Sequence, residues 1–121
     1  MRDHAEIIAA RAEHILPEDR DLIRAVFADG MPVSTLARLT GVDPRGLRRR
    51  VRALARRVLS DRFVFVLRSR SGWPTTRRRV ATACVLQGRS LRATARHLRL
   101  TLHAVRRHMD AVNALYDESR S

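Results

Sequence analysis

Lysine is absent from this 121-residue chain, and cysteine and aromatic residues are scarce. All 25 basic residues are arginine, whose planar guanidinium pairs bidentately with phosphate or with the edge of guanine. The single Cys84 cannot form an internal disulfide, which fits a reducing compartment, so we expect a cytoplasmic protein. Aromatic residues make up 4% of the chain, so the core must be built from aliphatic side chains. A modest aliphatic core is typical of a small helical protein.

Several functional classes lack their sequence signatures. No run of about 18 or more apolar residues is present, so we expect no transmembrane span and no membrane partner. The acids near the N-terminus do not fit a signal peptide. No phosphate loop, dinucleotide fingerprint or nucleophile elbow occurs, and no acid pair is isolated as in a catalytic dyad. His97, His103 and His108 lie close in sequence, but no cysteine or acid completes a metal-ligand set. We therefore expect no enzymatic activity, no metal and no cofactor.

Positive charge is concentrated in the middle of the chain. The formal net charge is +13 and the sequence pI is about 11.8. Residues 1–30 carry four arginines and seven acids, whereas residues 31–99 carry 18 arginines and two acids. Residues 100–121 carry three of each. This distribution favours a polyanion-binding middle flanked by less charged ends.

The stretch Val33–Leu59 predicts a short helix, a turn at Gly41 and a longer helix. Asp43 is placed to cap the longer helix, and proline is favoured at the next position, the first of the helix. Small Ala37 is expected where the two helices cross, and Val42 is expected to fill the core beside the turn. The longer helix has a buried stripe at helical spacing, formed by Leu47, Val51, Leu54 and Val58. Its opposite face carries Arg45, Arg48, Arg49 and Arg52. The spacing predicts a helix-turn-helix, in which the second helix enters the DNA major groove.

Two further helices are expected before this motif. Residues 3–15 have apolar residues at helical spacing, and Pro17 begins a helix that Gly30 ends in a left-handed conformation. Leu22, Ile23, Val26 and Phe27 are its expected buried stripe. We interpret the acidic residues 1–30 mainly as helices that close the core, with a partner-binding surface as the alternative.

The segment 60–73 is strand-like in propensity but begins with Ser60 and Asp61, which are typical of a helix start. We favour a short helix, since a lone strand would have no partner. Its apolar residues either pack internally, the role we favour, or form a dimer contact.

A repeat appears when the chain is shifted by 58 residues. The shift places Gly30 on Gly88 and Ala37 on Ala95, and it superposes the arginine pair 48–49 on the pair 106–107. Cys84 takes the place of Val26, so we interpret it as a small buried hydrophobe. The second copy departs at the turn, where Gly41 becomes Arg99. We predict an all-α protein of two tandem helix-turn-helix units of the three-helix type. The expected domains are 1–59, a connector 60–74, and 75–121.

Residues 16–54, LPEDRDLIRAVFADGMPVSTLARLTGVDPRGLRRRVRAL, resemble region four of bacterial sigma factors. The shared features are a Leu-Pro start, a helix, a glycine, and Leu-Ala and Gly-Val around the turn. In that family the second helix reads promoter DNA in the major groove. The resemblance implies base and phosphate contacts for Arg45, Arg48, Arg49 and Arg52, and phosphate contacts for Ser34, Thr35 and Arg38. It recurs more faintly at residues 74–112. Nothing in the chain resembles the sigma region that melts promoters.

These observations together predict a sequence-specific regulator of bacterial transcription that binds double-stranded DNA at the nucleoid. The base-reading positions are expected on the exposed faces of both second helices: Asp43, Arg45, Arg48, Arg49, Arg52, Thr101, His103, Arg106, Arg107 and Asp110. The expected phosphate contacts are Ser34, Thr35, Arg38, Arg77, Arg78, Arg79, Arg92 and Arg96. The alternatives are an architectural protein that binds DNA by charge alone, and an accessory factor that docks on RNA polymerase. Homodimerisation through the second unit is also left open.

Overall fold

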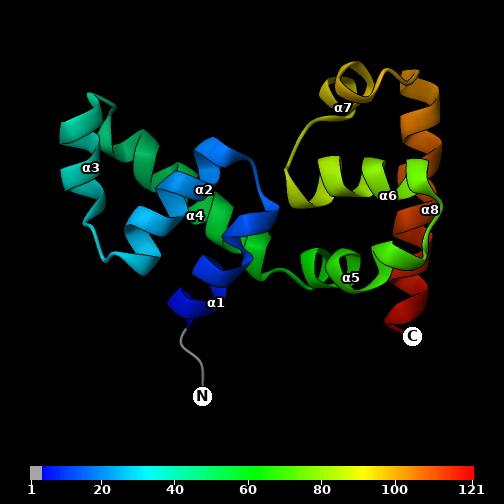
Figure 1. Ribbon diagram of the computed structural model, residues 1–121, viewed down its shortest axis with the longest axis horizontal. Coiled ribbons are helices and arrows are strands. Elements are labelled where there is room, and N and C mark those ends of the chain that lie inside the picture. The colour runs from blue at the N-terminus through cyan, green and yellow to red at the C-terminus, as the bar shows by residue number, and fades with distance from the viewer. Residues whose placement is uncertain (1–3) are drawn as a thin grey trace. The chain divides into compact units, whose positions relative to one another are not determined.

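The computed structural model describes residues 4–121, which form helices and no strand (Figure 1). The chain divides into two compact units, Met1–Ser60 and Asp61–Ser121, called the first and second units below. The first unit contains α1 (His4–Arg11), α2 (Pro17–Ile23), α3 (Val33–Thr40) and α4 (Pro44–Leu59). The second contains α5 (Asp61–Ser69), α6 (Thr75–Ala81), α7 (Leu91–Leu98) and α8 (Leu102–Ser119). The expected all-α fold class is confirmed.

The units repeat the same succession of local structures at the shift of 58 residues. Each begins with a helix that ends in a 3-10 turn, Ala12–His14 in the first unit and Arg70–Gly72 in the second. The next helix continues into a π-helical turn, Arg24–Ala28 or Thr82–Leu86. The repeat therefore includes α5, which corresponds to α1. Residues 61–74 belong to the second compact unit and supply its first helix.

The core of the first unit joins α1, α2 and α4. Its buried side chains come from these three helices, from the 3-10 turn that follows α1 and from the residue after that turn: Ile8, Ala12, Ile15, Ile23, Leu47, Val51, Leu54 and Val58. The four residues predicted for the inner face of α4 are all among them, so that stripe is confirmed. The guanidinium of Arg11 also donates to the Val58 carbonyl oxygen at 2.8 Å, which ties α1 to the end of α4. The N-terminal helices thus close this core.

The second unit has a corresponding core that includes α5. Phe63 and Val66 of α5 are buried, which confirms both the short helix and its internal packing role. Phe65 forms tilted ring contacts with Trp73 and Tyr116, at centroid distances of 5.8 Å and 5.5 Å. These contacts join α5, the following turn and α8 within one unit.

The turns between the last two helices of each unit are left-handed. Gly41 has φ 73°, and Arg99, at the corresponding position, has φ 57° and is the one non-glycine with positive φ among residues 4–121. Glycine enters this region without steric cost, whereas a residue with a Cβ does not. In both turns the backbone N–H of the next residue, Val42 or Leu100, donates to the backbone carbonyl oxygen of the small residue of the preceding helix, Ala37 or Ala95.

Val42 does not fill the core, and that prediction is wrong. Its side chain is 47% exposed and the nearby Leu39 is 69% exposed. Val42 lies at the edge of an open groove between α2, α3 and α4, together with Leu22 and Leu36. No described side chain covers this groove, so a residue expected to be buried remains half exposed.

Candidate nucleic-acid interface

One exposed face of α4 consists of arginines. Arg45, Arg48, Arg49 and Arg52 recur at a spacing of three or four residues, and all four are exposed. At about 100° per residue they form one stripe on the side opposite the buried stripe of α4. Arg56, one turn further on, lies on the same stripe and is also exposed. Arg56 was not among the predicted site residues, although its spacing of four from Arg52 indicates its place.

Two other arginines of α4 are turned away from that face. Arg50 donates to Asp19 Oδ1 at 2.6 Å, and the Arg57 Nη2 lies 3.9 Å from Asp19 Oδ2. Asp19 is only 12% exposed in its side chain, so α2 presents a nearly buried carboxylate to α4. Burial lowers the pKa of the Arg57 guanidinium, and the charge of Asp19 opposes this change. These two arginines hold α2 against α4 and do not add to the exposed stripe.

The two helix caps place Asp43 and Thr101, both predicted to read bases. Asp43 Oδ2 accepts from the backbone N–H of Gly46 at 3.0 Å. Thr101 Oγ1 accepts from the backbone N–H of Ala104 at 3.0 Å. Each side chain therefore begins its helix, α4 or α8, by satisfying a free backbone donor. Both caps lie at the end of the helix from which the exposed stripe starts.

Apart from the three arginines of α6, the predicted phosphate contacts lie on α3 and α7, the helices that precede the left-handed turns. On α3, Ser34 and Arg38 are exposed and Thr35 is partly buried. Buried Ala37 lies on the inner side of α3, which packs against α4. On α7, Arg92 and Arg96 are both exposed.

The corresponding face of α8 is less basic. His103, Arg106, Arg107 and Asp110 are exposed at the positions that match Arg45, Arg48, Arg49 and Arg52. The face thus carries two arginines, one histidine and one acid, compared with four arginines on α4. Val105 and Met109 are buried on the opposite side of α8, so the amphipathic arrangement is kept while the charge is not.

The three predicted phosphate contacts of α6 do not lie together. Arg77 lines a concavity of about 300 Å³ with Arg107 and His108 of α8. Its Nε atom is buried and has no hydrogen-bond partner among the described residues. Arg78 and Arg79 instead line a second concavity, in which no residue of α8 takes part. Only Arg77 is therefore brought beside the exposed face of α8.

Searches for similar proteins gave no match to a family model, to a curated protein or to a solved structure. Within residues 4–121, no helix is both long and apolar enough to cross a membrane. The same residues contain no group of three His, Cys, Asp or Glu side chains that could hold a metal ion.

Proposed function

We propose that the protein is a sequence-specific regulator of transcription that binds double-stranded DNA with α4 in the major groove. The observation that supports this most strongly is the stripe of five exposed arginines on α4, Arg45 to Arg56, opposite the buried stripe. The major groove, about 12 Å wide, admits one α-helix, and arginine pairs bidentately with guanine there.

In this proposal the first unit supplies most of the base recognition. Arg48 and Arg49 lie near the middle of the stripe, where a helix lying in the groove comes closest to base edges. Ser34 and Arg38 on α3 contact backbone phosphates, which fixes the position of α4 without reading sequence. In the second unit Arg106 and Arg107 read bases, and Arg77 contributes a phosphate contact beside them.

Selection of bound duplexes from a random library tests the proposal. After a preferred site is found, Arg48→Ala and Arg49→Ala should each weaken binding to it by about 1–3 kcal/mol and relax the preference at one base position. Arg24→Ala is the matched control, because Arg24 is exposed in the same unit but lies outside α3 and α4. If both α4 variants bind the selected and random duplexes as the wild type does, α4 does not read bases.

Architectural binding by charge alone is the second candidate, and the second unit favours it. Most arginines of that unit lie outside the exposed face of α8, which carries only Arg106 and Arg107. A protein of this kind would bind every duplex with similar affinity and strong salt dependence. Competition between the selected site and bulk duplex distinguishes the two, since a regulator prefers its site by a factor of about 10³ or more.

Docking on RNA polymerase through the acidic residues 1–30 remains a prediction with a different test. Ile8, Ala12 and Ile15 belong to the core, so deleting the N-terminal helix would unfold the first unit. Exposed Glu18 and Asp21 can be changed instead. Loss of polymerase capture by Glu18→Lys and Asp21→Lys, with duplex binding intact, would support an accessory factor.

A further inference from the structure

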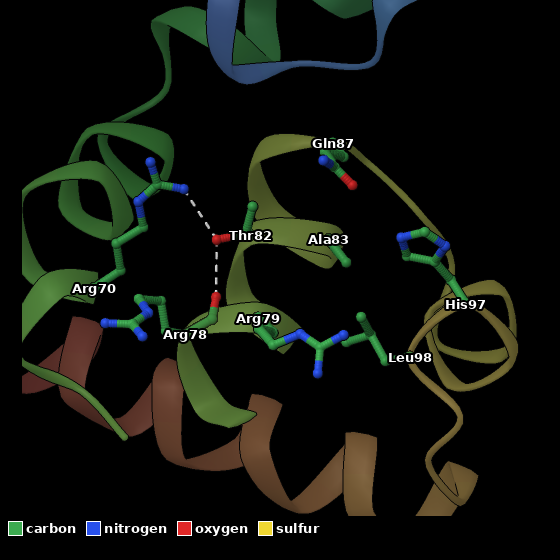
Figure 2. A pocket seen from close by; sticks show the side chains of 8 residues that line it. All are labelled: Arg70, Arg78, Arg79, Thr82, Ala83, Gln87, His97 and Leu98. Carbon is green, nitrogen blue, oxygen red and sulfur yellow. Dashed lines mark hydrogen bonds between the residues drawn. The ribbon is translucent and has the colours of Figure 1, made fainter. Parts of the chain in front are cut away.

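The second unit contains a concave surface that the proposed DNA interface does not use. It has a volume of about 330 Å³ and lies between the 3-10 turn before α6, α6 with its π-helical turn, and α7. Its polar lining consists of Arg70, Arg78, Arg79, Thr82, Gln87 and His97. We call it the arginine pocket. Figure 2 shows Arg79 extending from α6 toward His97 and Leu98 of α7, while Arg70 and Arg78 lie on the other side of the α6 ribbon.

The side chains of the arginine pocket offer hydrogen-bond donors, and the side-chain oxygens of Thr82 and Gln87 already accept hydrogen bonds. Thr82 Oγ1 accepts from Arg70 Nη1 at 3.0 Å and donates to the Arg78 carbonyl oxygen at 2.8 Å. Gln87 Oε1 accepts from Arg89 Nε at 3.1 Å, which leaves the Gln87 amide N–H groups as donors. No carboxylate lines the pocket. A surface of this composition is complementary to an anion and unsuited to a cation.

The first unit shows that the fold does not require this lining. At the shift of 58 residues, Arg70, Arg79, Gln87 and His97 correspond to Ala12, Asp21, Asp29 and Leu39. Arg78 and Thr82 correspond to Arg20 and Arg24, so the first unit carries two arginines and two acids at these positions. The groove between α2, α3 and α4 in the first unit is lined by the acids Glu18 and Asp21, by Arg50 and by apolar side chains. The excess of positive charge at this place therefore belongs to the second unit alone.

The charge and size of the pocket indicate the ligand class. Three guanidinium groups exceed what a single carboxylate neutralises, whereas a phosphate monoester carries about −1.5 to −2 and several acceptor oxygens. The volume lies at the lower end of small-molecule sites, roughly 300–1,000 Å³. No residue of α8 lines the pocket, which separates it from the DNA-reading face.

We propose that the arginine pocket binds the phosphate group of a small phosphorylated molecule. Arg70 is held in place by Thr82, and Arg79 makes no side-chain hydrogen bond or ion pair with a described residue. Arg70 and Arg79 would contact the phosphate oxygens from two sides, with Gln87 and His97 adding donors. This inference does not depend on DNA binding, since its ligand is free in solution.

Titration of the full-length protein with sodium pyrophosphate tests this, with sodium chloride at equal ionic strength as the blank. Two-dimensional amide NMR should show saturable shifts centred on residues 70–98. Arg79→Gln and Arg70→Gln should each weaken binding about tenfold or more, as expected for loss of a charged hydrogen bond. Arg68→Gln, which removes one exposed arginine of α5 outside the pocket, should bind as the wild type does.

Duplex binding by the same variants identifies the source of the phosphate. Unchanged duplex affinity and salt dependence in Arg79→Gln, with loss of pyrophosphate binding, supports a small ligand. Absence of saturable pyrophosphate shifts overturns the proposal. If Arg79→Gln instead lowers the salt dependence of duplex binding by about one phosphate contact, the arginine belongs to the DNA backbone site and the small-ligand proposal is wrong. A wild type that binds pyrophosphate but no duplex refutes only the proposed function.

Discussion

Replacing Asp19 should destabilise the first unit more than any other single loss of charge in it. The carboxylate is 12% exposed and faces Arg50 and Arg57, which are 49% and 26% exposed in their side chains. Asp19→Ala removes the one carboxylate within ion-pair distance of Arg57 among residues 4–121. The Arg57 Nε and Nη2 atoms are already buried without hydrogen bonds, so they would be left with an unneutralised charge.

The expected cost is about 2–3 kcal/mol. The half-exposed pair with Arg50 contributes about 0.2–1 kcal/mol, as exposed pairs do. Breaking a fully buried pair costs about 3–5 kcal/mol, and we reduce this to roughly 2 kcal/mol for Arg57 because part of its side chain still reaches water.

Urea denaturation followed by far-UV circular dichroism measures this cost. Trp73 is the single tryptophan and lies in the second unit, so its fluorescence follows that unit separately. Asp29→Ala is the matched control, because Asp29 is exposed and forms no ion pair with a described residue. Its effect should stay within about 0.5 kcal/mol.

A second substitution makes the test stricter. The second unit carries Leu115 at the position of Arg57, so an apolar residue fits this place in the fold. The double variant Asp19→Ala, Arg57→Leu should recover most of the lost stability, because a buried ion pair can be replaced by apolar groups at little cost. A cost of less than about 1 kcal/mol for Asp19→Ala, or a double variant no more stable than the single one, would contradict the role of Asp19 in neutralising Arg57.

Other substitutions test the turn, the second core and the thiol. Gly41→Arg copies the residue of the second unit and should lower the free energy of unfolding by about 1 kcal/mol. The cost comes from the positive φ alone, because a Cβ at this position meets no atom within 4 Å. Arg99→Gly should raise the free energy of unfolding by less than about 1 kcal/mol, and thermal unfolding measures both changes. Phe63→Ala should destabilise the second unit by about 3–5 kcal/mol in the Trp73 fluorescence transition, and an unchanged midpoint would contradict the packing role of α5. Burial raises the pKa of the Cys84 thiol. Iodoacetamide should therefore modify this thiol more slowly in the folded protein than in the urea-unfolded protein. The stability that the folded protein gains by keeping the thiol protonated should be lost as the pH rises through the raised pKa.

Periodicity predicted the elements whose burial follows a simple helical repeat. The inner stripe of α4 and the left-handed turns at Gly41 and Gly30 follow from local rules of spacing and backbone conformation. Only one of the four residues predicted as the stripe of the second helix, Ile23, is fully buried. Leu22 precedes the π-helical turn of this helix and lines the open groove beside Val42. The helix changes to the π-helical turn at Arg24, which shifts the register of Val26 and Phe27. Regular 3.6-residue spacing does not show such a change.

The correspondence of α5 with α1 was not visible in the sequence, because burial and local structure repeat there while residue identity does not. Ile8 and Val66 occupy corresponding places and both are buried, but Ala12 corresponds to Arg70 and Ile15 to Trp73. Residue identity is therefore lost at the shift of 58, while the helix and the following 3-10 turn are kept. The arginine pocket was missed for the same reason, since Arg70 comes from this segment.

The boundary between Ser60 and Asp61 has a practical consequence for dividing the chain. A cut there falls between α4 and α5 and leaves every buried residue of each half with its own core. A cut before Thr75, where similarity between the halves begins in sequence, would remove Phe63 and Val66 from the second core and Arg70 from its pocket. Fragments that carry one half each should therefore be divided after residue 60, so that each keeps its first helix, α1 or α5, and its complete core.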